Sequence, residues 1–404
     1  MPLLRSLYVC YLSLEDPLVD SQVLAYLEGL AQSGHTIHLL TFETRSLTRS
    51  RRRELRRAMR ARGLNWHGLR YHQRPSLPAT AFDTLCGAAV CAWLVRRHGL
   101  DAVHVRNHVP AAMAIVAAPF APHRLIFDIR GLMAEEYVDA GRWATGGLAF
   151  RMTKYVERAA MRRAAGTVVL TQRVKRALFG EEDRPDVFVI PCCADVERIA
   201  ADRAKRDEVR AALGLGEEPV MVYVGKFGGW YMSAEMADFF AVARGALPGL
   251  HFLVITQTGG STIEHEFARR AIEPADYTIT RVEHARLGEM LGAGDLAIAL
   301  IKPLPSKVAS SPTKIGECLA AGLPVLSTDV GDVMGLIRGS RAGFVLEEFS
   351  DDSYRVAAQA LAEMVADDTT SDRCVALADR ELSLSRIGLP RYRALYALVA
   401  SSRR

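Results

Sequence analysis

Short apolar runs and helix-like segments alternate along the first half of the chain. Ser6–Leu12 fits a buried strand, and Thr36–Thr41 fits a second one. Between them, Asp20-Ser21 can cap a helix whose apolar positions recur with helical spacing before Gly34. Helical patterns then separate four further apolar runs: Ala102–Val105, Arg124–Asp128, Thr167–Leu170 and Val187–Ile190. This order predicts a parallel sheet covered by helices on both faces.

The same alternation starts again after a polar stretch, Asp195 to Glu218. The expected strands there are Val220–Val224, His251–Thr256, Tyr277–Thr280, Leu296–Leu300, Pro324–Ser327 and Gly343–Val345. The expected helices are Glu235–Arg244, Ala285–Leu291, Lys314–Ala321 and Tyr354–Val365. We therefore predict an α/β protein of two Rossmann-like, doubly wound domains, 1–194 and 195–385, facing a central cleft. Residues 386–404, with the amphipathic segment Leu389–Val399, are expected to return as a helix to the first domain.

Composition narrows the class of protein. Of the 404 residues 50% are hydrophobic and 24% charged, which is ordinary for a globular protein. The net charge of +5 is too small to indicate a nucleic-acid binder. The seven cysteines form an odd set without a C-x-x-C pair, which argues against a disulfide framework or a structural zinc. A reducing compartment fits best.

Signals for a membrane or a secretory route are weak. No segment offers the roughly 18–20 uninterrupted apolar residues of a membrane-spanning helix. The apolar start, Leu3 to Leu14, lacks a small-residue cleavage site and runs into Glu15-Asp16. We expect a first buried strand there and a cytoplasmic protein, with attachment to a membrane surface as the open alternative.

The strongest chemical signal is the segment Ser310–Val325. A loop of Ser311, Pro312 and Thr313 opens a helix at Lys314, and the N–H groups of such a helix start suit a diphosphate. Glu317, one turn further, is placed to accept two hydrogen bonds from a ribose diol. The structural alternative is an ordinary capping box closed by Glu317.

A second signal is the glycine-rich turn after Val220–Val224. Gly225 would let backbone amides approach a phosphate, and Lys226 would neutralise its charge. A plain turn with a solvated lysine is the alternative. Because both loops follow strands of one domain, both can border the same cleft.

These two loops, followed by Ala320-Ala321-Gly322-Leu323-Pro324-Val325, resemble the nucleotide-binding domain of the large retaining, metal-independent GT-B glycosyltransferase family. This is the group of glycogen-synthase-like enzymes, lipopolysaccharide glycosyltransferases and mannosyltransferases. The family carries an E-x7-E pair; Glu317 matches the second glutamate, and Ala309 stands where the first is expected. In the family the first glutamate contacts the donor sugar. The resemblance implies that Lys226 meets the diphosphate.

The first domain resembles the same family in three segments. Leu24–Ile37 is similar to its first helix and G-H-x-V turn. Asp101–Arg106 is similar to its D-V-I-H-x-H strand, with Arg106 in place of the second histidine. Phe127–Gly131 lies where many members have a T-x-H-D stretch near the reacting centre, with Arg130 in the histidine's place.

Candidate catalytic and acceptor-side residues follow from these segments. Asp128, Arg130 and Lys226 are the catalytic candidates, because an arginine can bind phosphate and a carboxylate can accept a proton from a hydroxyl. An internal ion-pair network around Asp128 is the alternative, and His104 fits a buried strand histidine better than a base. The acceptor-side candidates are Asp20, Ser21, Arg106, His108 and Glu135.

The stretch Arg45–Arg62 holds nine arginines and one acid, Glu54. It fits either a solvated surface helix or a surface that attracts anionic lipid or a phosphorylated acceptor. Under the second interpretation, each basic residue near an anionic membrane would contribute about 1 kcal/mol to the binding free energy.

The sequence thus predicts transfer of a sugar from a nucleotide-diphosphate sugar to a hydroxyl acceptor, with a UDP-sugar favoured as donor and a GDP-sugar as the alternative. The acceptor class stays open between a saccharide, a lipid-linked and a small molecule. No cofactor is expected beyond the donor, and no metal, since neither domain shows an Asp-x-Asp pair or a histidine cluster. Retention of anomeric configuration is implied by the resemblance alone. Two alternatives are a nucleotide-sugar epimerase or hydrolase of the same fold, and a catalytically inactive nucleotide-sugar-binding subunit.

Overall fold

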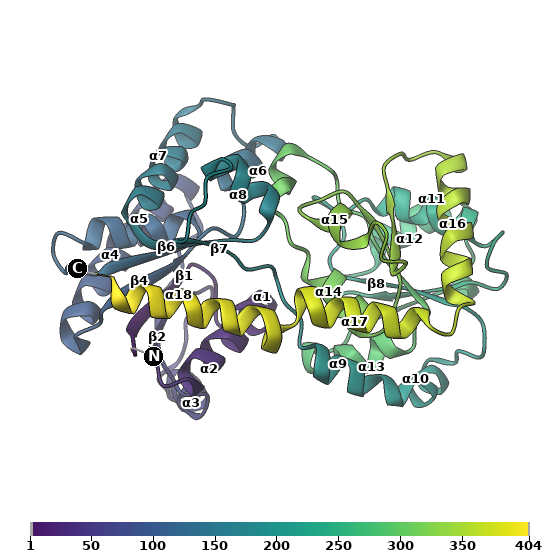
Figure 1. The fold of residues 1–404 in the computed structure, drawn as a ribbon, viewed down its shortest axis with the longest axis horizontal. Helices are drawn as coiled ribbons and strands as arrows, with labels where there is room; N and C mark the ends of the chain where they lie inside the picture. Colours follow the sequence, from purple (N-terminus) through teal and green to yellow (C-terminus); the bar gives the residue numbers. More distant parts are fainter. Residues whose placement is uncertain (1–2, 403–404) are drawn as a thin grey trace. The chain divides into compact units, whose positions relative to one another are not determined.

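The computed structural model describes residues 3–402 and divides into two units. The first unit is Met1–Pro191 with Gly388–Arg404, and the second is Cys192–Ile387. Each contains one parallel sheet with helices on both faces, as the sequence predicts (Figure 1). The acceptor-side and nucleotide-side roles that the sequence analysis gave to residues 1–194 and 195–385 stay predictions.

The first unit contains a seven-stranded parallel sheet in the order β3-β2-β1-β4-β5-β6-β7. Its strands are β1 (Arg5–Cys10), β2 (Thr36–Glu43), β3 (Leu64–Arg70), β4 (Ala102–Arg106), β5 (Arg124–Asp128), β6 (Ala164–Val169) and β7 (Val187–Val189). The strand order reverses between β1 and β4, and ligands of open α/β sheets bind where this reversal meets the strands' carboxyl ends. The sequence analysis missed β3, an edge strand in which polar residues separate Leu64 from Trp66 and follow it.

The helices of the first unit are α1 (Pro17–Val19), α2 (Ala25–Gln32), α3 (Arg49–Ala61), α4 (Ser76–His98), α5 (His108–Ala117), α6 (Met133–Asp139), α7 (Leu148–Arg163), α8 (Gln172–Phe179) and α18 (Leu389–Ser401). The predicted helix cap at Asp20-Ser21 is wrong. Asp16 caps the segment, because its carboxylate accepts from the N–H of Leu18 at 2.9 Å and Pro17 suits the first helical position. Asp20 and Ser21 lie in a π-helical turn, Asp20–Leu24, that joins α1 to α2.

The C-terminal helix α18 packs on the first unit, as predicted, against α2 and β6 (Figure 1). Gly166 in β6 allows this close approach, since a Cβ there would lie 2.4 Å from Cδ1 of Leu395. At the other end of the helix, Nη1 of Arg124 donates to the carbonyls of Val399 and Ala400 at 2.7 and 2.9 Å. The last helical carbonyls are thereby satisfied by a side chain of β5.

The second unit contains a six-stranded parallel sheet in the order β10-β9-β8-β11-β12-β13. Its strands are β8 (Val220–Val224), β9 (His251–Ile255), β10 (Tyr277–Thr280), β11 (Leu296–Ala299), β12 (Val325–Thr328) and β13 (Gly343–Leu346). Its helices are α9 (Val196–Asp202), α10 (Arg206–Leu213), α11 (Ser233–Ala243), α12 (Ser261–Ala268), α13 (Leu287–Gly292), α14 (Thr313–Ala320), α15 (Val333–Ile337), α16 (Asp351–Val365) and α17 (Thr370–Leu382). The order reverses between β8 and β11, which is the second switch point.

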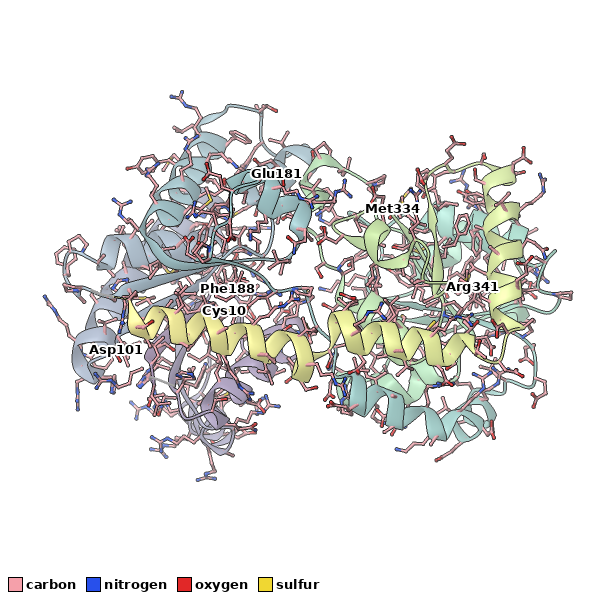
Figure 2. The ribbon with its side chains drawn as sticks, in the orientation of Figure 1. Cys10, Asp101, Glu181, Phe188, Met334 and Arg341 are labelled. Atoms are coloured by element: carbon pink, nitrogen blue, oxygen red, sulfur yellow. The ribbon has the colours of Figure 1, made fainter. Side chains whose placement is uncertain are left out.

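Alternate side chains of the strands fill two cores, one on each face of the second sheet. Val220 and Val222 of β8 belong to the core that α14 and α17 cover, whereas Met221 and Tyr223 belong to the core under α11 and α16. A strand buried on both faces shows a continuous apolar run, which is why the sequence located it well. Figure 2 shows the side chains that fill both units, with Cys10 at the end of β1 labelled in the first. All seven cysteines are free thiols in the structure.

The sequence analysis overlooked one long apolar helix. By length and composition, α4 could cross a membrane, and 44% of its most apolar window is buried inside the structure. Asp83 interrupts its apolar run and is itself buried. The carboxylate of Asp83 accepts from the hydroxyl of Tyr11 at 2.8 Å and from the backbone N–H of His72 at 2.9 Å. These contacts fit a helix that packs in the outer layer of the first unit.

Candidate functional site

The two predicted loops of the second unit meet at its switch point. The turn beginning at Gly225 follows β8, and the loop that leads into α14 follows the neighbouring strand β11. Gly225 has a φ of +141°, and a Cβ at this position would lie 2.5 Å from Nζ of Lys314. The first turn of α14 therefore contacts the glycine turn directly, and the sequence prediction that both border one site is consistent with this geometry.

Lys314 is the charged group at the centre of this site. Its side chain is buried, and its Nζ has no hydrogen-bond partner among residues 3–402. The ammonium lies over the rings of Tyr223 and Tyr231, 4.5 and 4.0 Å from their centroids. Burial lowers the pKa of Lys314 to about 7, although Cys318 and Glu317 act in the opposite direction. A buried cation that lacks an anionic partner is the kind of group that a phosphate would complete.

The structure places Lys314, and not Lys226, at the centre of the site. The sequence analysis assigned the main charge to Lys226, whose side chain is exposed. Lys314 was included only as part of the helix start, and the tyrosines around it carried no motif. Ser311 does not present its hydroxyl freely, because its Oγ accepts from the backbone N–H of Cys192 at 3.0 Å.

The capping-box interpretation of Glu317 is wrong. The N-cap of α14 is Pro312, which makes no side-chain capping bond, and Thr313 is the first helical residue. Glu317 lies too far into the helix to reach back to that cap. Its Oε1 lies 3.1 Å from Nε2 of His284, in the turn before α13. His284 was missed because it belongs to no motif, and only the fold brings it to Glu317.

Ala309, where the resembling family has its first glutamate, is buried in a short 3-10 turn, Pro305–Ala309. Beside it, the buried ammonium of Lys307 lies 4.0 Å from the ring centroid of Trp230. This part of the site therefore contains a cation packed on an aromatic ring and no glutamate at position 309.

Two buried arginines meet at the switch point of the first unit. Nη2 of Arg106 and Nη2 of Arg130 both donate to Oε1 of Gln22, at 3.0 and 3.1 Å. Arg106 is only 6% exposed, and its Nη1 has no hydrogen-bond partner within the described chain. Asn107 follows with a φ of +70°, and its Oδ1 accepts from the N–H of Arg130 at 3.0 Å. Such strained backbone is concentrated at functional sites.

Asp128 is part of an internal network, which is the alternative that the sequence left open. Its carboxylate is fully buried, accepts from the hydroxyl of Tyr392 in α18 at 3.0 Å and lies 3.6 Å from Nη1 of Arg130. Burial would raise its pKa, but Arg130, His104 and Arg106 together hold that pKa at about 2. A carboxylate held so acidic is a poor proton acceptor, so the geometry favours a structural role. His104 is buried, as predicted, and its Nδ1 lies 3.1 Å from the hydroxyl of Tyr396.

His108 and Glu135 belong to a second network behind the first. Nε2 of His108 lies 2.9 Å from Oε2 of Glu157, and Lys154 contacts Glu157 and, at 2.8 Å, Glu135. Glu135 lies in α6, the helix that follows β5. His108 and Glu157 are buried, whereas Lys154 and Glu135 are partly exposed.

The acceptor-side candidates Asp20 and Ser21 make local contacts. Asp20 pairs with Arg62 at 3.3 Å, and the hydroxyl of Ser21 donates to the carbonyl of Pro17 at 3.0 Å. Arg62 ends the basic stretch, which forms α3 with Leu55 and Met59 buried beneath it. The predicted helix is thus present; its attraction to an anionic partner stays a prediction.

The expectation that the chain has no histidine cluster is wrong. His38, His67 and His98 come together in the first unit from three separate elements. Their wide spacing in the sequence, 29 and 31 residues, hid them from motif analysis.

The fold is that of the GT-B glycosyltransferases. It has two parallel β-sheets, each covered by helices and each with a switch point, and a terminal helix that packs on the first unit. The solved structure of a glycosyltransferase from Rickettsia africae matches with a TM-score of 0.74 and 14% identity, covering 99% of this chain and 100% of that one. Anabaena HepE in complex with UDP-glucose matches with a TM-score of 0.69 and 13% identity, covering 98% and 100%. These likenesses establish the fold.

Sequence comparison finds partial likeness to two kinds of glycosyltransferase sequence. Residues 19–198 match the profile of Glycosyltransferase Family 4. The alpha-D-kanosaminyltransferase of Streptomyces kanamyceticus is 25% identical over 207 residues. That stretch is 49% of this chain and 51% of the kanosaminyltransferase, so the likeness spans about half the length of each.

Proposed function

We propose that this protein is a glycosyltransferase that moves a sugar from a nucleotide-diphosphate sugar to a hydroxyl acceptor. The GT-B fold and the two sequence matches support this class. The single observation that carries the proposal is the buried ammonium of Lys314 beside Gly225 at the switch point of the second sheet. This is the position at which ligands of such sheets bind.

In this proposal the second unit holds the donor. The ammonium of Lys314 and the amino-terminal end of α14 neutralise the departing diphosphate, and Lys226 adds charge from the exposed turn. Glu317 accepts hydrogen bonds from the ribose diol, with His284 orienting its carboxylate. Because these groups are held in place before the reaction, they stabilise developing charge without reorganisation.

The finer features are part of the same proposal. A UDP-sugar is favoured as donor; the HepE structure with UDP-glucose supports this choice by likeness of fold alone. Transfer with retention, without a metal at the reacting centre, follows from the family resemblance. Localisation in the cytoplasm follows from the odd cysteine set and the sequence of Leu3–Leu14, and peripheral contact between α3 and an anionic membrane follows from the basic composition of that helix.

The first unit would receive the acceptor. Arg106 and Arg130 bring two buried guanidinium groups to the ends of β4 and β5, and Asp128 lies 3.6 Å from Nη1 of Arg130. Nη1 of Arg106, which has no hydrogen-bond partner within the described chain, favours an anionic group, such as a phosphate or carboxylate, on the acceptor or on the departing diphosphate. Asp128 would position Arg130 and would not itself accept the proton.

The test is incubation of the chain with UDP- and GDP-sugars, with and without hydroxyl acceptors, while release of free nucleotide diphosphate is measured. Slow release without an acceptor, accelerated by a suitable acceptor, is the expected result. Release that no acceptor accelerates would favour a hydrolase or epimerase. Binding without any release, shown by a thermal shift, would favour an inactive nucleotide-sugar-binding subunit. Lys175→Met, in α8 of the first unit, is the matched control for Lys314→Met and should behave as the parent.

A further inference from the structure

Three histidines lie together at one edge of the first sheet. His38 comes from β2, His67 from β3 and His98 from the last turn of α4. One ligand nitrogen of each lies within 4.8 Å of the others. Nδ1 of His38 is 3.0 Å from Nε2 of His67, and the rings of His38 and His98 have centroids 4.4 Å apart. The proposed sugar transfer uses none of these side chains.

We propose that the His38–His67–His98 cluster binds a divalent transition-metal ion, and that Zn²⁺ is the ion it suits best. Imidazole nitrogens bind Zn²⁺ at about 2.0–2.1 Å in tetrahedral geometry, which places ligand nitrogens about 3.4 Å apart. The 3.0 Å between Nδ1 of His38 and Nε2 of His67 is close to that value, and no ligand nitrogen of the cluster lies more than 4.8 Å from another. Small rotations of the rings would bring three nitrogens to the ion, and water would complete its coordination.

The protonation of the rings is compatible with metal binding. His38 is 6% exposed and His67 is half-buried. Burial, followed by the neighbouring rings, lowers the pKa of both residues to about 4, so both are neutral at pH 7. A neutral imidazole has one lone-pair nitrogen, and a shift of its N–H to the other nitrogen exchanges donor for ligand. The contact between His38 and His67 can therefore be replaced by two bonds to one ion.

Charges around the cluster set the strength of binding. The C-terminal end of α4 carries partial negative charge and favours a cation. Arg56 opposes it, because its positive charge contributes to the lowered pKa of His67. Arg96 and Arg97 share the last turn of α4 with His98. The cluster contains no carboxylate among the described residues, so we expect an affinity nearer micromolar than picomolar.

The location points to a structural ion. His38 is the third residue of β2, and His98 precedes β4, so the cluster lies toward the amino-terminal edge of the sheet. Arg106 and Asp128 lie at the opposite, carboxyl ends of their strands. An ion bound by the cluster would join β2, β3 and the end of α4 without meeting the reacting groups.

The experiment is titration of the untagged, full-length chain with Co²⁺ and Zn²⁺ after treatment with a chelator. Co²⁺ should produce visible absorption bands at a stoichiometry of one, and Zn²⁺ should displace them. Zn²⁺ should also raise the thermal unfolding temperature, and excess chelator should reverse the rise. Absence of the Co²⁺ bands and of the thermal shift would overturn the proposal.

Two variants identify the ligands. His98→Ala lies at a helix end, where loss of the side chain should be tolerated, and should weaken Zn²⁺ binding at least tenfold. His265→Ala removes an exposed histidine of α12 in the second unit and should bind like the parent. Equal Zn²⁺ affinity for parent and His98→Ala would show that the ion binds elsewhere and overturn the assignment. Arg56→Gln should tighten binding, since it removes the opposing charge.

Discussion

Replacing Lys314 by methionine should weaken donor binding while it stabilises the fold. Burial lowers the pKa of Lys314 from its ordinary 10.5 to about 7. At about 1.4 kcal/mol per pH unit this corresponds to roughly 5 kcal/mol, an upper bound on the cost of burying the charge. Methionine fills similar space without that charge. We expect the free energy of unfolding of Lys314→Met to rise by about 1–4 kcal/mol at pH 7.

The same substitution should lower affinity for the donor. A hydrogen bond between the ammonium and a phosphate oxygen contributes about 1.5–3 kcal/mol, which corresponds to a loss of about 10- to 150-fold in affinity. Opposite effects on stability and binding are expected where a charged group is held in an unfavourable environment for function. A residue with a purely structural role would lose both together.

The pKa of Lys314 also predicts a pH dependence. Below pH 7 the free protein is already protonated at Lys314, so affinity for a UDP-sugar should be constant. Above pH 7 Lys314 of the free protein loses its proton, whereas in the complex the negative diphosphate keeps Lys314 protonated, so affinity should fall by up to tenfold per pH unit. The stability of the parent should rise over this range, because the folded state has lost the proton that the unfolded state keeps up to about 10.5.

Isothermal titration calorimetry with a UDP-sugar between pH 6 and 9, together with urea unfolding, measures both effects. Lys314→Met should show a flat pH profile, and Lys175→Met should match the parent. The reasoning is refuted if Lys314→Met binds the donor like the parent, or if it unfolds at lower urea with no change in affinity.

Four further predictions concern the other candidate residues. Glu317→Gln should weaken nucleotide binding by about 1–3 kcal/mol in calorimetry with little change in unfolding, and unchanged affinity would reject its contact with ribose. Lys226→Ala should lower turnover less than Lys314→Met, since its ammonium is exposed, and activity should survive a chelator; restoration by Mg²⁺ or Mn²⁺ after chelation would contradict the metal-independent reaction. Asp128→Asn should cost about 3–5 kcal/mol of stability above pH 4, and about 2.5 kcal/mol of this difference should be lost as pH falls from 4 through 2, where the native carboxyl protonates; a loss of turnover without a loss of stability would restore its catalytic assignment. Replacing five arginines of α3 by glutamine should raise the acceptor KM, flatten its salt dependence and abolish sedimentation with anionic vesicles; the five are Arg51, Arg52, Arg53, Arg56 and Arg57. Unchanged acceptor kinetics, together with no lipid binding by the parent, would show that α3 is only a solvated surface helix.

The alternation of apolar runs and helical patterns was enough to predict the fold. Buried parallel strands such as Val220–Val224 are continuously apolar, so a short stretch of sequence is enough to locate each of them. The edge strand Leu64–Arg70 lacks that pattern because one side of it faces no partner strand, and it was missed. The long helix Ser76–His98 was missed for another reason, because Asp83 interrupts its apolar run.

Only part of the candidate site could be predicted from the sequence. Gly225 and Glu317 stand in local motifs, because a turn and a helix start each need particular residues at fixed spacing. The sequence alone therefore determined the two sheets, the loops at their edges and the residue types available there.

Tertiary structure decided which of those residues are charged groups without partners and which are satisfied. It buried Lys314 between Tyr223 and Tyr231 and left Lys226 in solvent. In the sequence the two lysines look alike, since Lys226 follows a glycine turn and Lys314 stands at a helix start. Tertiary structure also tied Asp128 to Tyr392, 264 residues away, and gathered three histidines from separate elements. Burial and pairing depend on contacts between distant parts of the chain, and these contacts set the pKa and the free energy of each group, which no local pattern records.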